Sequence, residues 1–329
     1  MKSSVTALLP RSIKIVTLGV DASHGLHADA PLPIGASAAI GSFDGVHLGH
    51  QHVIESAIAA AKRRGVPSAV ICFDPHPQSF FHKDGKPFRL MQLSQQLRVF
   101  EALGVDYAFV LRFDANLSAL TAEDFARLIL RDHLKLSHVS AGFDFQFGKR
   151  GGGHAKDLVA LGEMLDFTTD ILPCQTDTKG HKLSSSAVRD ALLAGDAKLA
   201  AEILGRPQAY LGEVIHGAKQ GRTIDFPTLN ITLGDYQRPR YGVYITQTTL
   251  PDGRVINGVS NIGVRPTVGG GIELLETYLF NFSEEIYGQV VETALLDFIR
   301  PEAKFDSFDE MQQEIQNDAA KARAYFQNT

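Results

Sequence analysis

The sequence is poor in cysteine and has no long run of apolar residues. Cys72 and Cys174 are its two cysteines, and they stand far apart with no Cys-x-x-Cys pair. Neither a disulfide framework nor a structural zinc cluster is therefore expected. No apolar run reaches the roughly 20 residues that a membrane-spanning helix needs. Residues 1–10 lack the small-residue cleavage site of a signal peptide. We expect a cytoplasmic protein with no membrane partner.

The sequence also lacks an excess of positive charge. It contains 32 Lys and Arg residues against 37 Asp and Glu residues, for a net charge of -5. Proteins that neutralise a nucleic-acid backbone need the opposite balance, so no nucleic-acid partner is expected. The chain is 44% hydrophobic and 21% charged, which is typical of globular proteins. Because its 329 residues exceed the roughly 100–200 residues of one domain, we predict two domains.

In the N-terminal part, short β-type apolar runs alternate with segments of helical periodicity. We expect strands at residues 38–40, 69–73, 107–111 and 138–141, and helices at residues 53–64, 95–103 and 122–133. The strands read as buried on both faces, which is typical of parallel sheets. This alternation predicts an α/β domain with a doubly wound parallel sheet. Ligands of such sheets usually lie beyond the carboxyl ends of the strands.

From about residue 210 onward, the pattern changes to short strands in which polar and apolar residues alternate. Turn residues separate these strands, as at residues 251–253 and 269–271. The pattern predicts an antiparallel β-barrel, and a helix that begins after Ser307 closes the chain. Residues 187–204 read as helical. We therefore predict domains at residues 1–204 and 205–329.

The most informative stretch, GSFDGVHLGH at residues 41–50, follows the first of these strands. A buried strand leads through a glycine-containing turn into a helix, whose N-terminus is suited to bind phosphate. His47 and His50 are three residues apart and project from one helix face. Gly49, which lies between them, is interpreted as leaving room for a ligand's phosphate chain to approach. Two imidazoles there can stabilise charge that develops on phosphate. The alternatives are incidental histidines, or a zinc site without a third ligand at suitable spacing.

A second helix start carries three hydroxyls and an arginine, in SSSAVR at residues 184–189. The hydroxyls can cap the helix, and they can also donate to phosphate oxygens. Arg189 can supply a fork of donors to the same oxygens. Taken alone, the segment is more typical of an ordinary helix cap.

Four segments together resemble the N-terminal module of bacterial bifunctional riboflavin kinase/FAD synthetases. They are GSFDGVHLGHQ, FDPHP at residues 73–77, GFDFQFG at residues 142–148, and SSSAVR. The resemblance implies an HxGH-type nucleotidyltransferase in which His47 and His50 assist the transfer of AMP from ATP to FMN. It implies ATP-binding roles for Gly41, Phe43, Asp44, Ser185, Ser186 and Arg189, and flavin-binding roles for Asp144 and Phe147. Ser42 and Ser186 depart from the usual Asn and Thr, and the second change keeps the hydroxyl.

In the C-terminal part, a strand at residues 212–216 feeds a glycine-bearing loop that contains Lys219 and Arg222. The loop is suited to close over phosphates, although it is not a Walker loop. Thr228 and Asn230 alternate onto one face of the extended segment that follows. Their oxygens are suitable ligands for Mg²⁺, and the alternative is a polar strand face.

GRTIDFPTLNI at residues 221–231, YGVY at residues 241–244 and NIGVRPT at residues 261–267 resemble the riboflavin kinase module of the same family. The resemblance implies that Thr228 and Asn230 hold Mg-ATP and that Glu276 acts as the base toward the ribityl hydroxyl. It implies further ATP-binding roles for Gly217, Lys219, Gly221 and Arg222. The neighbouring carboxylates Glu273 and Glu292 are interpreted as ordinary solvated strand residues.

Three positions depart from the kinase pattern. Asp225 stands where the family has glycine, and Tyr278 and Asn281 replace a histidine and an aspartate. A negative charge beside a triphosphate would repel it. Two functions therefore remain open: a bifunctional enzyme, or an FAD synthetase whose C-terminal domain only binds flavin.

An adenylyltransferase for another acceptor, such as phosphopantetheine or nicotinamide mononucleotide, and a flavin-binding regulator without activity are further alternatives. The leading prediction is the bifunctional enzyme, with riboflavin, FMN and ATP as small-molecule partners. It would use ATP as a substrate and Mg²⁺ as a cofactor, and no prosthetic group is expected. The sequence favours no particular oligomeric state.

Overall fold

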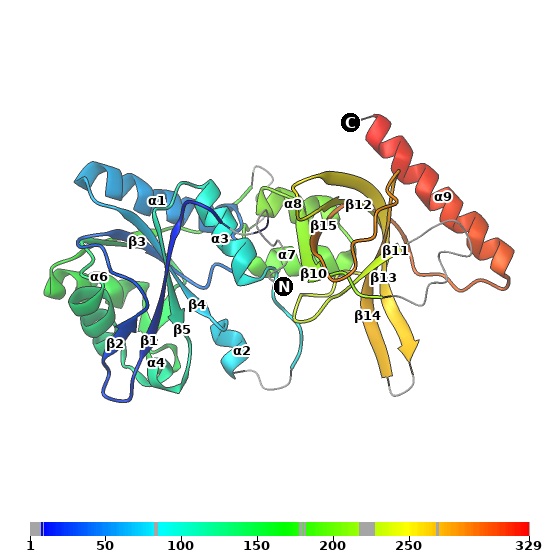
Figure 1. Ribbon diagram of the computed structural model, residues 1–329. Coiled ribbons are helices and arrows are strands. Elements are labelled where there is room, and N and C mark those ends of the chain that lie inside the picture. The colour runs from blue at the N-terminus through cyan, green and yellow to red at the C-terminus, as the bar shows by residue number, and fades with distance from the viewer. Residues whose placement is uncertain are drawn as a thin grey trace. The chain divides into compact units, whose positions relative to one another are not determined.

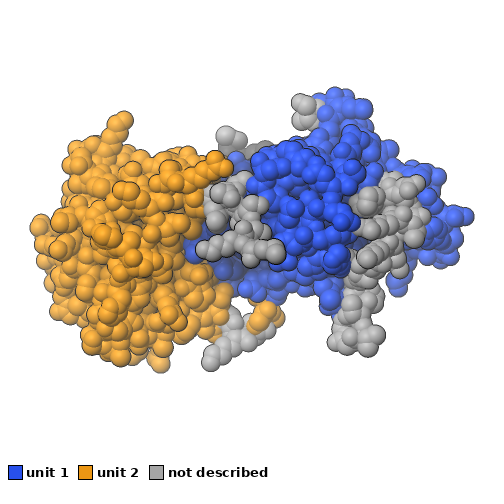
Figure 2. Space-filling model, in the orientation of Figure 1, with its two compact units in different colours: residues 1–9, 87–95, 184–329 blue, residues 10–86, 96–183 orange. Residues whose placement is uncertain are grey.

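The chain folds into two compact units. The computed structural model (Figure 1) describes residues 8, 10–81, 85–177, 180, 182–216, 228–267 and 270–328. The N-terminal unit consists of Pro10–Lys86 and Gln96–Leu183, and the C-terminal unit of Met1–Leu9, Pro87–Gln95 and Ser184–Thr329 (Figure 2). No described helix has both the length and the apolar character needed to cross a bilayer.

The N-terminal unit is built on a seven-stranded sheet with the order β2-β1-β5-β4-β3-β6-β9. Its strands are β1 (Lys14–Val20), β2 (Leu26–Ala28), β3 (Ser37–Ile40), β4 (Ser68–Asp74), β5 (Tyr107–Arg112), β6 (His138–Gly142) and β9 (Thr168–Leu172). All neighbours are parallel except β1 and β2. The predicted doubly wound α/β architecture is confirmed, and the four predicted strands lie within β3, β4, β5 and β6.

Helices flank this sheet (Figure 1), and the longest of them, α1 (Leu48–Arg64), packs against β3, β4 and β6. The others are α2 (Pro77–Phe81), α3 (Leu93–Ala102), α4 (Ala115–Ala119), α5 (Ala122–Asp124), which continues as a π-helix at Phe125–His133, and α6 (Ala155–Leu165). A 3-10 turn (Lys149–Gly151) lies between the short paired strands β7 (Gln146–Phe147) and β8 (Gly153–His154). Gly65 ends α1 in the left-handed conformation, with φ +67°.

The order of the strands places a switch point beside β3. The chain continues from β3 through β4 and β5 on one side, and returns to form β6 and β9 on the other side. Doubly wound sheets bind their ligands at such points, beyond the carboxyl ends of the strands. The carboxyl end of β3 leads directly into residues 41–47, so the fold puts the GSFDGVHLGH stretch at the switch point.

The C-terminal unit is built on a six-stranded antiparallel sheet with the order β10-β15-β12-β13-β14-β11. The strands are β10 (Gln208–Glu213), β11 (Thr228–Thr232), β12 (Gly242–Thr249), β13 (Val255–Thr267), β14 (Gly270–Leu279) and β15 (Val290–Pro301). Ile215, just after β10, forms a bridge with Asn230 in β11. The first and last strands thus approach each other, and the sheet curls into a half-barrel, as the prediction of a barrel required.

The two faces of the curled sheet pack differently. Tyr210, Tyr244 and Leu275 are buried in the core that the sheet encloses. On the outer face, Val259 packs with Ala322 of the closing helix α9 (Phe308–Gln327). The Ser307 side chain caps α9 by accepting a hydrogen bond of 3.1 Å from the Glu310 amide. The expected terminal helix is therefore present and begins where the sequence indicated.

Two features of the fold differ from the sequence-based expectations. The sequence predicted no strand in the first roughly 35 residues, but β1 and β2 lie there and form one edge of the sheet. Buried and more exposed residues alternate along β1, where Val16, Leu18 and Val20 are the buried ones. This alternation is typical of a strand. The predicted helical stretch at residues 187–204 is two helices, α7 (Ser185–Ala194) and α8 (Ala197–Leu204). Gly195, with φ +83°, ends the first of them.

One segment of the N-terminal half of the sequence belongs to the C-terminal unit. In Pro87–Gln95, the Arg89 amide donates to the Asp235 carbonyl at 3.0 Å, and its carbonyl accepts from the Gln237 amide at 2.7 Å. Gln95 accepts a hydrogen bond from the Tyr236 hydroxyl at 2.5 Å. Helices α7 and α8 also belong to this unit, and the boundary between residues 204 and 205 stays a prediction.

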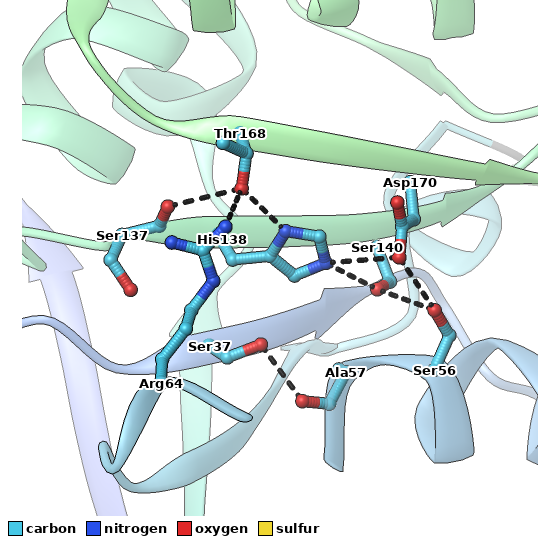
Figure 3. A network of polar contacts seen from close by, with 9 residues as sticks. All are labelled: Ser37, Ser56, Ala57, Arg64, Ser137, His138, Ser140, Thr168 and Asp170. Carbon is cyan, nitrogen blue, oxygen red and sulfur yellow. Dashed lines mark hydrogen bonds and ion pairs between the residues drawn. The ribbon is translucent and has the colours of Figure 1, made fainter. Parts of the chain in front are cut away.

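A buried polar network lies where β3, β6 and β9 begin, at the edge of the sheet away from the switch point (Figure 3). The His138 ring contacts the Thr168 hydroxyl at 2.7 Å and the Ser140 hydroxyl at 3.1 Å. The Asp170 carboxylate lies 3.5 Å from the same ring. Burial lowers the pKa of His138, which the Asp170 carboxylate opposes and the Arg64 guanidinium reinforces. The folded state therefore favours the neutral imidazole.

This network makes the stability of the N-terminal unit depend on pH. Since the pKa of His138 lies below its ordinary value of 6.5 in the folded state, the unfolded chain takes up the proton first on acidification. The stabilisation is complete above pH 6.5 and is lost below it, by at most about 1.4 kcal/mol per pH unit. Urea unfolding of His138→Gln between about pH 7.5 and 5.5 should show a flatter acid limb than the wild type. The exposed His52→Gln on α1 should keep the wild-type slope, and equal slopes for all three proteins would contradict the assignment.

Candidate active sites

The turn between β3 and α1 has an unusual backbone conformation. Phe43 has a φ of +50° and Val46 a φ of +39°, on either side of Gly45 at +83°. A positive φ is rare for any residue with a side chain, and for β-branched valine it is an outlier. Each such residue costs on the order of 1–3 kcal/mol, so the surrounding structure must hold it in place. Strained turns of this kind are typical of functional sites.

The two histidines of the turn lie together at the N-terminus of α1. His47 is the N-cap, and its Nδ1 accepts a hydrogen bond of 3.2 Å from the His50 amide. The two rings are stacked, with their centroids 3.6 Å apart. His47 is 6% exposed, and His50 is half-buried. The two imidazoles therefore lie together at the positive end of the helix dipole.

Gly49 is closely packed at the start of α1. A Cβ at this position would lie 3.0 Å from the Leu183 carbonyl oxygen and 3.1 Å from two atoms of the His47 ring. Glycine is therefore required so that the His47 ring and the chain at residue 183 can both approach α1. This packing gives a reason for Gly49 that does not involve room for a phosphate chain.

The other residues expected to bind ATP in the turn are mostly turned inward. Phe43 is 2% exposed and Asp44 is 3% exposed. A Cβ at Gly41 would lie 3.1 Å from the Phe43 ring, so glycine there allows this ring to fold back over the strand end. The packing assigns these residues to the shape of the turn, and their contact with ATP stays a prediction.

The residues expected to bind flavin lie in different surroundings. Phe147 is 6% exposed and stacks on Phe145, with centroids 5.4 Å apart. Asp144 is exposed, and its carboxylate lies 3.9 Å from the Lys182 ammonium. Both side chains come from the chain that follows β6, beside the switch point. Phe147 is packed in the core, whereas Asp144 is accessible to a ligand.

The SSSAVR segment forms the start of α7 in the C-terminal unit. Ser184 supplies the cap by accepting a hydrogen bond of 3.2 Å from the Ala187 amide. The Arg189 Nε donates to the Phe88 carbonyl at 2.9 Å, and its guanidinium lies over the Phe88 ring. Phosphate binding by Ser185, Ser186 and Arg189 stays a prediction.

In the C-terminal unit, the strand register brings the residues predicted for the kinase site next to one another. Asn230 of β11 lies directly opposite Glu276 of β14, and Thr228 lies opposite Tyr278. Residues directly opposite in an antiparallel pair share one face, with their Cβ atoms roughly 4.5–5.5 Å apart. The two predicted metal ligands and the predicted base therefore lie side by side on one face of the half-barrel.

A further polar residue on this face had no role predicted from the sequence. Asn261 of β13 lies opposite Glu276 on its other side, so that two amide side chains flank the carboxylate. The sequence places Asn261 in a recognised motif, but only the register between β13 and β14 brings it to Glu276. Asn230 is 2% exposed, and its Oδ1 finds no hydrogen-bond donor among the described residues. A buried amide oxygen without a donor is suited to hold a cation.

Glu273 and Glu292 were expected to be ordinary solvated strand residues, but both make specific contacts. Arg238 lies 2.5 Å from Glu273, and its guanidinium holds the pKa of that carboxyl below its usual value. The Tyr241 hydroxyl also donates to Glu273. Glu292 accepts a hydrogen bond of 2.6 Å from Gln95. Both carboxylates are thus engaged in structural contacts.

The departures from the kinase pattern fall into two groups. Asn281 has a φ of +55°, and asparagine tolerates this conformation better than most residues with a side chain. Tyr278 packs on the outer face with Phe280, at a centroid distance of 5.7 Å. Both replacements therefore fit the fold. Gly217, Lys219, Gly221, Arg222 and Asp225 lie outside the described residues.

Two family models match the chain in succession. The model for FAD synthetase matches residues 30–187, and the model for riboflavin kinase matches residues 204–326. The bifunctional riboflavin kinase/FMN adenylyltransferase of Haemophilus influenzae is 39% identical over 92% of this chain and 98% of its own length. The Escherichia coli protein of the same name is 37% identical, over 92% of this chain and 97% of its own.

The chain belongs to the bifunctional riboflavin kinase/FMN adenylyltransferase family. The resemblance, the two transferase activities and the two-domain architecture expected from it are thereby confirmed. The crystal structure of a Streptococcus pneumoniae protein named as a macrolide-efflux protein has a TM-score of 0.80 to this chain at 29% identity. It covers 93% of this chain and 98% of its own length. We refer below to the adenylyltransferase site around His47 and the kinase site around Glu276.

The packing around Gly49 leads to a prediction. In Gly49→Ala, the new methyl must displace the His47 ring or the Leu183 carbonyl, so FAD formation from FMN should fall roughly 10–100-fold. Formation of FMN from riboflavin should stay unchanged. Gly19→Ala in β1 is the matched control, since a Cβ there meets nothing within 4 Å. Chromatography of the flavin products gives both rates. Undiminished FAD formation by Gly49→Ala would contradict the packing role.

Proposed function

We propose that His47 and His50 carry adenylyl transfer to FMN in this enzyme, and that Glu276 carries phosphoryl transfer to riboflavin. The stacked imidazole pair at the N-terminus of α1 supports the first assignment. The position of Glu276 opposite Asn230 supports the second. ATP is a substrate of both reactions.

In the adenylyltransferase reaction, an FMN phosphate oxygen attacks the α-phosphorus of ATP. A new P–O bond forms, the bond from the α-phosphorus to the bridging oxygen of the β-phosphate breaks, and pyrophosphate leaves. Negative charge grows on oxygens around the α-phosphorus as this happens. Ring N–H groups of His47 and His50 and amides of the first turn of α1 would donate to these oxygens. No covalent intermediate with the protein is needed.

In the kinase reaction, the terminal ribityl hydroxyl of riboflavin attacks the γ-phosphorus of ATP. Glu276 would accept the hydroxyl proton, the bond between the γ-phosphorus and the bridging oxygen breaks, and ADP leaves. A carboxylate flanked by Asn230 and Asn261 is oriented by its neighbours on the sheet. Since strands are more rigid than loops, the sheet suits the positioning of a base.

Magnesium is proposed as the metal of the kinase site. Thr228 and Asn230 offer a hydroxyl and a buried amide oxygen on one strand face, which are the hard oxygen ligands that Mg²⁺ prefers. These residues fit the ion and would hold it together with phosphate oxygens. When bound, Mg²⁺ supplies charge neutralisation to the phosphates. We also propose a cytoplasmic location, because ATP is the shared substrate.

Replacing the proposed base should separate the two activities. Glu276→Gln keeps the shape of the side chain but cannot take a proton, so riboflavin phosphorylation should fall roughly 10²–10⁴-fold in kcat. FAD formation from added FMN should stay unchanged. Glu273→Gln is the comparison, because it should lose about 1–2 kcal/mol of unfolding free energy through the Arg238 contact and keep its turnover. Equal turnover of Glu276→Gln and the wild type would rule out the role as base.

Removing both imidazoles should have the opposite outcome. The double variant His47→Ala, His50→Ala should lose FAD formation by at least about 10²–10³-fold, since the donors to the developing charge are gone. Riboflavin phosphorylation should remain near the wild-type rate. Product analysis from riboflavin and ATP should then show FMN accumulating without FAD. If both activities fell equally, the two sites would not be independent as proposed.

A further inference from the structure

A buried glutamine on α3 holds the turn that carries the adenylyltransferase histidines. Gln96 is 2% exposed, and its side-chain amide donates to the carbonyl oxygens of two consecutive turn residues. The distance is 3.2 Å to the Ser42 oxygen and 3.0 Å to the Phe43 oxygen. A glutamine amide has two N–H donors, enough to serve both carbonyls. Gln96 and the turn both belong to the N-terminal unit.

The two carbonyls that Gln96 binds lie at the start of the strained part of the turn. Phe43, with φ +50°, is the first of its three residues with positive φ, and Gly45 and Val46 are the others. Phe100, one helical turn beyond Gln96 on α3, meets the Phe43 ring edge to face at 5.9 Å. One face of α3 therefore binds both the backbone and the side chain of Phe43. A turn with this conformation needs such contacts from outside itself.

From Phe43 the contacts lead directly to the histidine pair. The Phe43 ring meets the His50 ring edge to face, with centroids 5.3 Å apart, and His50 stacks on His47. A shift of the Phe43 backbone would therefore move the surface on which His50 rests. Closely packed side chains transmit such shifts, because the interior has little free volume.

We propose that Gln96 is a positioning residue for adenylyl transfer, which acts through Phe43 on the orientation of His50 and His47. This inference rests on the proposed role of the two histidines. It assigns to the glutamine two hydrogen bonds that fix the turn before substrate arrives. The positioned rings then need no reorganisation in the transition state.

The first test replaces the glutamine with an apolar residue of similar length. Gln96→Met keeps the volume and removes both donors, so kcat for FAD formation should fall roughly 10–100-fold, with KM for FMN and ATP nearly unchanged. Gln95→Met is the matched control, because Gln95 is equally buried on the same helix but hydrogen-bonds to Tyr236 and Glu292 in the C-terminal unit. Its kcat for FAD formation should match the wild type. A wild-type kcat for Gln96→Met, or an equal fall for both variants, would overturn the proposal.

A second variant gives a readout that lost stability alone would not produce. Gln96→Glu presents lone pairs to the two carbonyls when ionised, and one O–H donor when protonated. Its kcat for FAD formation, relative to the wild type, should therefore rise as the pH is lowered from about 8 to 6. A ratio that stays constant with pH would overturn the proposal, also if Gln96→Met fails to fold. If the double histidine variant keeps FAD formation, the proposed function itself fails. If it loses FAD formation while Gln96→Met does not, only the positioning role fails.

Discussion

The adenylyltransferase half depends on one tight connection between a strand and a helix. β3 lies in the middle of the sheet with parallel neighbours on both sides, and it runs into α1 through residues 41–47. The chain turns within this short connection with positive φ at Phe43 and Val46. The conformational cost is offset by the packing of Phe43 and the bonds from Gln51 and Gln96. As a result, two imidazoles stand at a helix N-terminus at the switch point of the sheet.

The kinase half obtains its site from strand register, without a strained turn. Antiparallel pairing of β11, β14 and β13 puts Asn230, Glu276 and Asn261 in one row across three strands. A slip of one residue in either pairing would turn these side chains to the opposite face. Buried hydroxyl pairs on the inner face help to fix the register, since Ser260 bonds to both Thr246 and Thr277 at 2.8 Å. The same strands therefore provide stability on one face and chemistry on the other.

The sequence predicted the features that depend on local patterns. Continuous apolar runs indicated β3 to β6, and the glycine turn before a helix indicated the histidine pair. The break between α7 and α8 was not predicted, because the helical periodicity continues on both sides of Gly195, the residue that ends α7. The places of Gln96 and Asn261 follow from contacts between distant segments, which no local pattern contains. Gly49 was recognised, but its reason lies in the Leu183 carbonyl, far along the chain.

Each unit is built from segments that are not contiguous in the sequence, and this affects folding during synthesis. Pro87–Gln95 is completed well before the strands on which it docks, because residues 96–183 are translated in between. Tyr236 lies 141 residues beyond Gln95, so at about 5–20 residues per second the segment waits on the order of 7–28 s for this partner. Arg89 and Gln95 cannot meet Asp235 and Tyr236 until the second half has emerged. The C-terminal unit therefore cannot complete its packing around Pro87–Gln95 before the second half of the chain has been synthesised.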